Sequence, residues 1–277
     1  MKKWYKGFIL LLAILTATAL AACGSDAANG EAEDKKEIKF GATAGPYSDM
    51  VKKAIIPGLE EKGYKVKITE FSDYVQPNKA LDKGSIDANL FQHSIYLENF
   101  IKENNVDLTG LITVPTAPMG IYSNTFKSLD EVKDGATITI PNDPTNASRA
   151  FTTLQDQGLI KIDENANILT VSEKDIVENK KNLEFQPIES GQLPRSIDSA
   201  DLVAVPGNFA LAANFDLLSA LALEDMKDDF RNIVTVQTEN KDAQFAKDIK
   251  EVIESEGFEK VIDEEFEGFG KPEWMKQ

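Results

Sequence analysis

From residue 38 onward, short segments rich in β-branched residues alternate with longer segments of helical periodicity. A strand is predicted at 38–42, a helix at 47–62 that Gly63 ends, and a second strand at 65–70. Because a helix joins each strand to the next, the strands are expected to pair in parallel, with helices on the sheet faces. The alternation predicts an α/β protein.

The alternation is interrupted once and then restarts. Further strands are predicted at 88–91, 137–141 and 202–205, and further helices at 78–83, 95–103, 146–157 and after Asn208. The apolar stretch 111–122 contains Pro115 and Pro118, and we interpret it as a crossing into a second lobe. The acidic helices between 242 and 266 are expected to return to the first. Lobe 1 is then 38–118 with 218–277, and lobe 2 is 119–217.

The N-terminus has the layout of a secretory signal. A basic start is followed by an apolar stretch at 7–19, which is short for a membrane span. Small residues then precede Cys23, the only cysteine, in a pattern that resembles a lipobox. We expect a signal peptide at 1–22, a lipid anchor on Cys23 at the extracytoplasmic face of the membrane, and a flexible tether at 23–37. The alternative is an ordinary secretory signal that contains a cysteine.

Several chemistries are disfavoured by composition. If lipid occupies Cys23, no thiol remains for a disulfide, a metal site or nucleophilic catalysis. Loss of Lys2, Lys3 and Lys6 with the signal takes the formal net charge from −16 to −19, which argues against nucleic-acid binding. With a single histidine and no nucleophile elbow or phosphate loop, we expect no metal, no cofactor and no enzyme activity.

Polar and aromatic clusters follow the predicted strands at 71–78, 89–96, 141–149 and 205–209. Open parallel sheets bind ligands at this edge. In the third cluster Thr145 or Asn146 suits a helix N-cap, which would place Arg149 in the first turn, where the helix dipole disfavours a cation. Arg149 therefore indicates a carboxylate site. The alternative is a surface arginine paired with Asp143 or with an acid of the neighbouring lobe.

Aromatic residues dominate the first two clusters. Phe91, His93 and Tyr96 form an F-x-H-x-x-Y pattern, and Tyr74 lies in the cluster before it. These rings are typical of a packed core as well as of a ligand site. Their position beside amide side chains at strand ends favours an apolar cleft wall with a few fixed hydrogen-bonding groups.

Long segments resemble the methionine-binding lipoproteins of the NlpA family, the receptor components of methionine ABC importers. They are FSDYVQPNKAL, DANLFQHSIYLE, PMGIYS, TITIPNDPTNASRA and SGQLPRSIDSADLVAVPGNFAL. The similarity runs from about Phe40 to Trp274. It implies a two-lobed periplasmic-binding-protein fold of type II, with a ligand cleft between two α/β lobes.

The resemblance also implies a binding site and partners. The aromatic wall around a thioether corresponds to Tyr74, Phe91, His93 and Tyr96; the carboxylate ligands correspond to Asn146 and Arg149; and the asparagines that contact the ligand's backbone groups correspond to Asn208 and Asn232. The implied ligand is L-methionine, and the implied partners are the permease and ATPase subunits of an importer. The protein itself is expected to be a monomer.

Three departures from the family pattern leave the exact ligand open. Family members usually have proline where this chain has Ala44, an acidic residue where it has Ala117, and asparagine or glycine ahead of Asn208, where it has Pro206. A methionine-containing dipeptide or another small neutral amino acid is the alternative ligand. A surface adhesin is an alternative or additional role.

Overall fold

A computed structural model describes residues 36–276. The predicted signal peptide, Cys23 and the tether up to residue 35 lie outside the described residues. The tether was expected to reach residue 37, but β1 (Glu37–Thr43) already begins there, since Glu37 is in register with Lys65 of the neighbouring strand. Among residues 36–276, no helix combines the length and apolar character needed to cross a bilayer.

The first sheet has the strand order β2-β1-β3-β12-β4. Besides β1, its strands are β2 (Lys65–Phe71), β3 (Ala88–His93), β4 (Leu108–Thr113) and β12 (Asn232–Gln237). The predicted parallel pairing is confirmed for β1 with β2 and β3. The strands β4 and β12 were not predicted, and β12 runs antiparallel to both β3 and β4.

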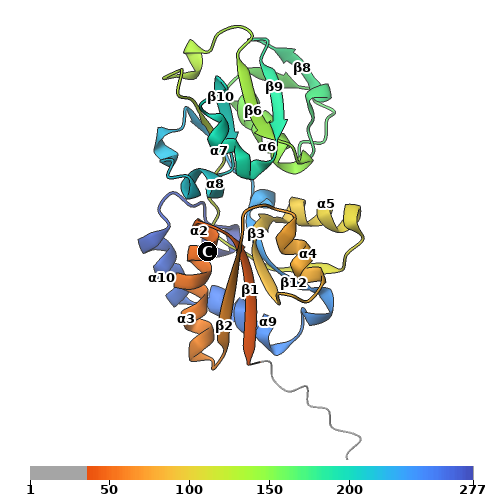
Figure 1. Ribbon diagram of the computed structural model, residues 1–277, viewed down its shortest axis with the longest axis vertical. Coiled ribbons are helices and arrows are strands. Elements are labelled where there is room, and N and C mark those ends of the chain that lie inside the picture. The colour runs from red at the N-terminus through yellow and green to blue at the C-terminus, as the bar shows by residue number, and fades with distance from the viewer. Residues whose placement is uncertain (1–35, 277) are drawn as a thin grey trace, which may run out of the picture. The chain divides into compact units, whose positions relative to one another are not determined.

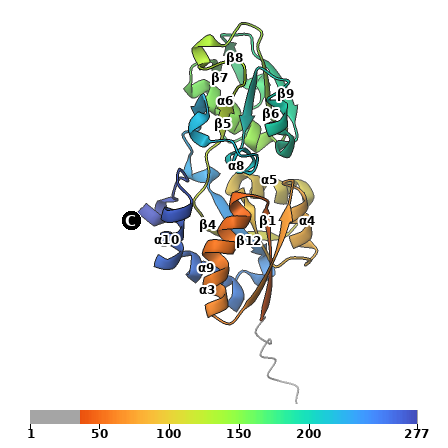
Figure 2. The ribbon, with the colours of Figure 1, turned by 60° about the vertical axis from the view of Figure 1, so that its left-hand side comes forward.

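Helices cover both faces of this sheet (Figure 1). One face carries α2 (Pro46–Met50), α3 (Ile56–Glu61), α9 (Gln244–Ile253) and α10 (Glu256–Glu265), and the other carries α4 (Gln76–Asp82) and α5 (Ser94–Asn104). The C-terminal helices lie beside α3, as both views show (Figures 1 and 2). The predicted return of the acidic helices to the first lobe therefore agrees with their packing.

The helix predicted at 47–62 contains a π-helical turn. This turn, Val51–Ile55, joins α2 to α3. Pro57 at the start of α3 has no N–H for the carbonyl one turn earlier, and its ring crowds that carbonyl, so the helix widens just before it. Gly63 ends the helix with a positive φ of 88°, as predicted.

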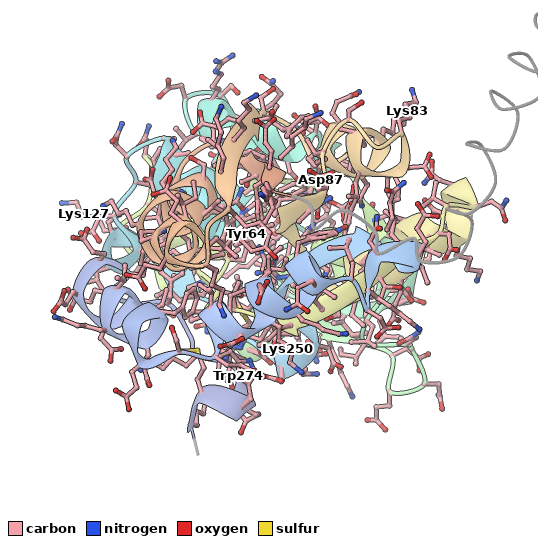
Figure 3. All side chains as sticks on the ribbon, turned by 90° about the horizontal axis from the view of Figure 1, so that it is seen from below. Tyr64, Lys83, Asp87, Lys127, Lys250 and Trp274 are labelled. Atoms are coloured by element: carbon pink, nitrogen blue, oxygen red, sulfur yellow. The ribbon has the colours of Figure 1, made fainter. Side chains whose placement is uncertain are left out.

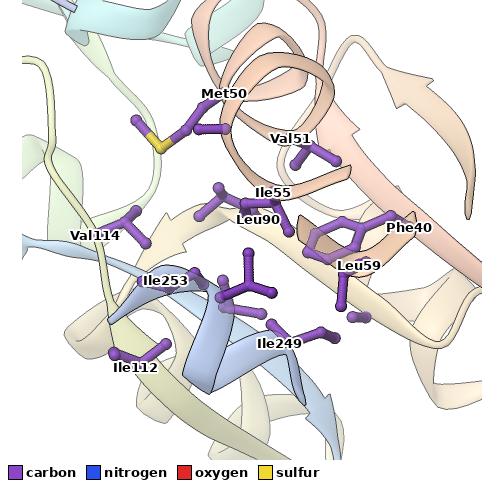
Figure 4. Close-up of a cluster of buried hydrophobic side chains, with 14 of the residues drawn as sticks. Phe40, Met50, Val51, Ile55, Leu59, Leu90, Ile112, Val114, Ile249 and Ile253 are labelled. Carbon is purple, nitrogen blue, oxygen red and sulfur yellow. The ribbon is translucent and has the colours of Figure 1, made fainter. Parts of the chain in front are cut away.

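The core of the first lobe lies between the sheet and the helices α2, α3, α9 and α10. Phe40, Leu59, Leu90 and Ile249 point toward one another there (Figure 4), and each is fully buried. Charged side chains lie outside, as Lys83 and Lys127 show at the edge of the molecule in Figure 3. Burial of this apolar surface is the main source of stability for the first lobe.

The second sheet has the order β11-β5-β10-β6-β9. Its strands are β5 (Gly120–Tyr122), β6 (Thr137–Pro141), β9 (Glu184–Ile188), β10 (Leu202–Val205) and β11 (Ala222–Leu223). The helix α6 (Pro144–Asp156) packs on one face, and α7 (Leu193–Ser196) and α8 (Gly207–Ala212) pack on the other. A small antiparallel pair, β7 (Ile160–Ile162) and β8 (Ile176–Asn179), extends this lobe.

The chain passes between the sheets twice. The first crossing, residues 114–119, contains Pro115 and Pro118. The return was expected at residue 218, but β11 still pairs with β5, with Ala222 opposite Ile121. The short strand satisfies the backbone groups at the edge of β5, so the chain leaves the second sheet only after Leu223 and crosses at 224–231.

The C-terminal segment packs against the first crossing. The Trp274 indole N–H donates to the Thr113 carbonyl at 3.0 Å, and Thr116 forms a β-bridge with Gly270. Seven short 3₁₀ turns complete the described residues: Leu129–Glu131, Glu173–Asp175, Ser190–Gln192, Leu217–Ser219, Asp228–Phe230, Thr238–Asn240 and Glu273–Lys276.

Candidate functional site

A small cavity lies between the two lobes, at the carboxyl ends of β3 and β6. Seven of the eight residues predicted to bind ligand line it, and the exception is Tyr96. Its volume is about 10 Å³, room for about one water molecule. The full lining is Tyr47, Tyr74, Phe91, Gln92, His93, Thr116, Ala117, Asn146, Arg149, Gly207, Asn208 and Asn232.

Aromatic rings form one wall. The ring centroids of Tyr74 and Phe91 are 5.8 Å apart, and Phe209 of α8 lies 4.9 Å from Tyr74. Tyr96 stands behind them: its ring meets that of Phe91 edge-on, and its hydroxyl donates to the Tyr74 carbonyl at 3.0 Å. Tyr96 also borders a separate groove of about 330 Å³, so it supports the wall and lines that groove.

His93 connects the lobes. Its Nδ1 accepts the Tyr96 N–H at 3.0 Å, which caps α5, and its Nε2 lies 3.3 Å from Asn146 Oδ1 in the other lobe. Because Nδ1 is an acceptor, the ring proton resides on Nε2 and points to Asn146. Burial, and then the positive charge of Arg149, hold the His93 pKa well below its usual value. The imidazole is therefore neutral.

A second bond between the lobes joins Tyr74 to Asn208. The Tyr74 hydroxyl donates to Asn208 Oδ1 at 2.6 Å, and burial raises the Tyr74 pKa well above its ordinary value. The first residue of α8, Gly207, lies against the first crossing: a Cβ there would collide with the Pro118 carbonyl oxygen and with Ala117. This glycine permits the close approach of α8 to the crossing segment.

The N-cap of α6 differs from the expectation. Asp143, rather than Thr145 or Asn146, is the cap, and its carboxylate accepts the Asn146 N–H at 2.9 Å. Pro144 suits the first helical position because it has no N–H to satisfy. Arg149 therefore lies in the second turn, and the dipole argument for it was wrong.

Arg149 is nonetheless buried, with only 4% of its surface exposed, so it is not a surface arginine. Its Nε and Nη2 donate to the two carboxylate oxygens of Glu224, at 2.8 and 2.6 Å, and Nη1 donates to Asn146 Oδ1 at 2.8 Å. The guanidinium lies 5.6 Å from the ring centroid of Phe230. Burial is the largest single influence and lowers the Arg149 pKa, but the charge and the hydrogen bonds of Glu224, together with Tyr74 and Tyr47, outweigh it, so the pKa is raised.

Glu224 was missed by sequence reasoning. It follows β11, where no motif marks it, and its side chain is 6% exposed. Its Oε2 also accepts the Met119 N–H at 3.0 Å, and its own N–H donates to the Met119 carbonyl. Glu224 thus joins both crossings to the arginine of the cavity.

Gln92 was also missed as a site residue, although it lies within the F-x-H-x-x-Y pattern. Its side-chain amide exchanges two hydrogen bonds with Asn78, at 2.7 and 2.8 Å, and lies 3.3 Å from the Thr235 hydroxyl. Asn89 donates to the same Asn78 oxygen. This buried amide network fixes the carboxyl end of β3 under the cavity.

Asn232 begins β12 opposite His93, and its N–H donates to the Thr116 hydroxyl at 2.7 Å. Within residues 36–276, His, Cys, Asp and Glu side chains form no group of three or more that is arranged to hold a metal ion. The amide and hydroxyl groups of the cavity lining can form hydrogen bonds, and the Arg149 guanidinium can pair with a carboxylate.

The model of the NlpA lipoprotein family matches residues 38–274. The chain belongs to the NlpA lipoprotein family. This confirms the resemblance drawn from the sequence motifs. The D-methionine-binding lipoprotein MetQ of Salmonella typhi is 36% identical over 273 residues, 98% of both chains. The methionine-binding lipoprotein MetQ of Bacillus subtilis is 36% identical over 273 residues, 97% of both chains.

Two solved structures of methionine-binding proteins share the fold. A nutrient binding protein from Burkholderia cenocepacia, bound to methionine, has a TM-score of 0.79 and 36% identity over 83% of this chain and 97% of its own. The methionine-binding protein MetQ has a TM-score of 0.81 and 34% identity over 87% of this chain and 100% of its own. The expected two-lobed periplasmic-binding-protein fold is confirmed.

The neutral, buried His93 predicts a pH dependence of stability. The pKa of His93 is depressed in the folded protein and is about 6.5 in the unfolded chain. Its contribution to the free energy of unfolding is therefore fully present above about pH 6.5, and it decreases as the pH falls toward the folded-state pKa. Urea unfolding between pH 7.5 and 5.5 should show a loss of up to about 1.4 kcal/mol per pH unit below pH 6.5. His93→Gln should flatten this slope; equal slopes would contradict the account.

The Arg149–Glu224 pair predicts an asymmetric mutational effect. Arg149→Met leaves the Glu224 carboxylate buried without its cation and should lower the free energy of unfolding by about 3–5 kcal/mol. The double variant Arg149→Met with Glu224→Gln should recover most of this loss, since no unpaired charge remains. Urea unfolding without ligand measures the free energy of unfolding of the single and of the double variant. A single-variant loss below about 1 kcal/mol would show that the pair is unimportant.

Proposed function

We propose that this protein is a lipid-anchored, extracytoplasmic substrate-binding protein that captures L-methionine and delivers it to an ABC importer. The observation that carries this proposal is the convergence of seven predicted ligand residues, from both lobes, on one cavity. The names of its relatives, methionine-binding lipoproteins, support the same role. We propose that it acts as a monomer that meets the permease and ATPase subunits.

Arg149 is proposed to hold the ligand carboxylate. A guanidinium has five N–H donors, and the contacts described above use three of them. Because Glu224 occupies the edge formed by Nε and Nη2, the end formed by Nη1 and Nη2 remains for a carboxylate. Asn146, Asn208 and Asn232 supply neutral groups for the rest of the amino-acid head.

The aromatic wall is proposed to surround the thioether. Sulfur packs favourably against aromatic rings, and Tyr74, Phe91 and His93 line the cavity, with Tyr96 packed against Phe91 behind it. A cavity of about 10 Å³ cannot contain methionine unless the lobes separate. The two crossings, residues 114–119 and 224–231, are where such a hinge motion would occur.

A methionine-containing dipeptide is the second candidate. The groove of about 330 Å³ beside Tyr96 is large enough for an additional residue, and it borders the aromatic wall. Val75, Phe100 and Asn142 are among the residues that line it, from both lobes. Another small neutral amino acid is the remaining alternative.

Thermal melting of ligand-stripped protein tests the proposal. A ligand at a thousandfold excess over its Kd stabilises the folded state by about 4 kcal/mol, so L-methionine should raise the melting temperature by several degrees. Norleucine, which lacks sulfur, should raise it less. Glutamate should have no effect, because its second carboxylate would be buried without a partner.

D-methionine and glycyl-methionine are the informative competitors in this series. A larger shift with D-methionine than with L-methionine would change the stereochemical assignment alone. A shift with glycyl-methionine and none with L-methionine would change the substrate to a dipeptide. No shift with any of them would contradict the proposed function.

The lipid anchor on Cys23 has a separate test. Cys23→Ser should abolish lipid modification and block cleavage before residue 23. In cells that express each form, the wild-type protein should partition with membranes after a high-salt wash, and mass spectrometry should detect lipid on its N-terminal cysteine. Lipid-modified Cys23→Ser protein, or a wild-type N-terminus without lipid, would overturn the anchor.

A further inference from the structure

The charges of the cavity sum to zero. Arg149 is the only charged residue in the cavity lining, and Glu224 neutralises it through two hydrogen bonds. The histidine of the lining is neutral because burial keeps its pKa low, and the hydroxyl of Tyr47 is neutral because burial raises its pKa to about 12. All other polar groups of the lining are amides, hydroxyls or backbone groups.

A second carboxylate, Asp143, lies near enough for its charge to act on the Tyr74 hydroxyl of the lining. It is half-buried at the N-terminus of α6, outside the lining, and its oxygens accept hydrogen bonds from Asn146 and Thr145. The positive end of the helix dipole and these donors offset its charge locally. The charge that acts on a ligand beside Arg149 is therefore controlled mainly by Glu224.

We propose that Glu224 is a specificity-determining residue that restricts this site to ligands of zero net charge. The inference rests on the proposed function and adds a rule for the ligand's charge. Glu224 does not line the cavity and acts through Arg149.

The physical basis is the cost of burying net charge. A zwitterion such as methionine places one negative and one positive group in the cavity, so the buried charge stays zero. The hydroxy analogue of methionine has the same length and thioether but lacks the ammonium group, so it adds one negative charge beside the Glu224 carboxylate. At a separation of several ångströms and an effective dielectric constant near 20, one such interaction changes an affinity roughly tenfold or more.

The experiment compares two ligands on three proteins. Calorimetry at pH 7.5 gives the Kd of L-methionine and of its 2-hydroxy analogue for wild type, Glu224→Gln and Glu224→Asp. Wild type should prefer methionine by at least about a hundredfold, because the analogue loses hydrogen bonds and adds charge. In Glu224→Gln this preference should fall by at least about tenfold, since the uncompensated Arg149 attracts an anion. Glu224→Asp keeps the charge and should keep the preference within about threefold.

The ratio of the two affinities separates a change in specificity from structural damage, because misplacement of Arg149 would lower the affinity for both ligands alike. Asp228→Asn is the matched control: it removes an acid of the same crossing, whose side chain is 48% exposed and pairs with Arg231. Its preference should equal that of wild type.

The remaining outcomes each have a clear meaning. An unchanged preference in Glu224→Gln, or a wild-type protein that binds the hydroxy analogue as tightly as methionine, would overturn the inference while the proposed function stands. A wild-type protein that binds neither ligand would contradict the proposed function and the inference with it. If Glu224→Gln fails to fold by circular dichroism, the inference is overturned by a wild-type protein that binds the hydroxy analogue as tightly as methionine, or by a folded Glu224→Asp protein that loses the preference.

Discussion

The buried ion pair of Arg149 and Glu224 is the interaction on which the cavity depends. An arginine that is only 4% exposed needs a partner, and Glu224 meets two of its nitrogens while it also accepts the Met119 N–H. Because Glu224 begins the second crossing and Met119 ends the first, the ion pair connects the arginine to both segments that join the lobes. The position of the guanidinium is thus coupled to the geometry of the two crossings.

Neutral hydrogen bonds complete the contact between the lobes. His93 reaches Asn146, and Tyr74 reaches Asn208, each from the first lobe to the second. Both bonds use residues that also line the cavity, so these polar groups are within reach of a ligand when the bonds open. Exchange of one set of polar bonds for another keeps the net cost of opening small, and this suits a receptor that must both capture a ligand and release it.

The fold and most of the site were predictable because both follow local patterns. Alternating strands and helices predict the α/β lobes, Pro115 and Pro118 lie in the first crossing, and the strand ends predict the edge at which Phe91 and Asn146 line the cavity. The second crossing was placed too early because β11 has only two residues, too few for a periodic signal. Glu224 could not be found, since its role arises from a contact with Arg149, 75 residues away, and nothing in its neighbourhood marks it.

The central claim is that the cleft captures methionine through a compensated arginine and an aromatic wall. Mass spectrometry of the small molecule that remains bound after mild purification, without dialysis, tests this claim most directly. The account predicts methionine at close to one equivalent in wild type, and its absence from an Arg149→Met/Glu224→Gln variant that remains folded. A different small molecule at that stoichiometry in wild type, or methionine retained equally by the double variant, would contradict it.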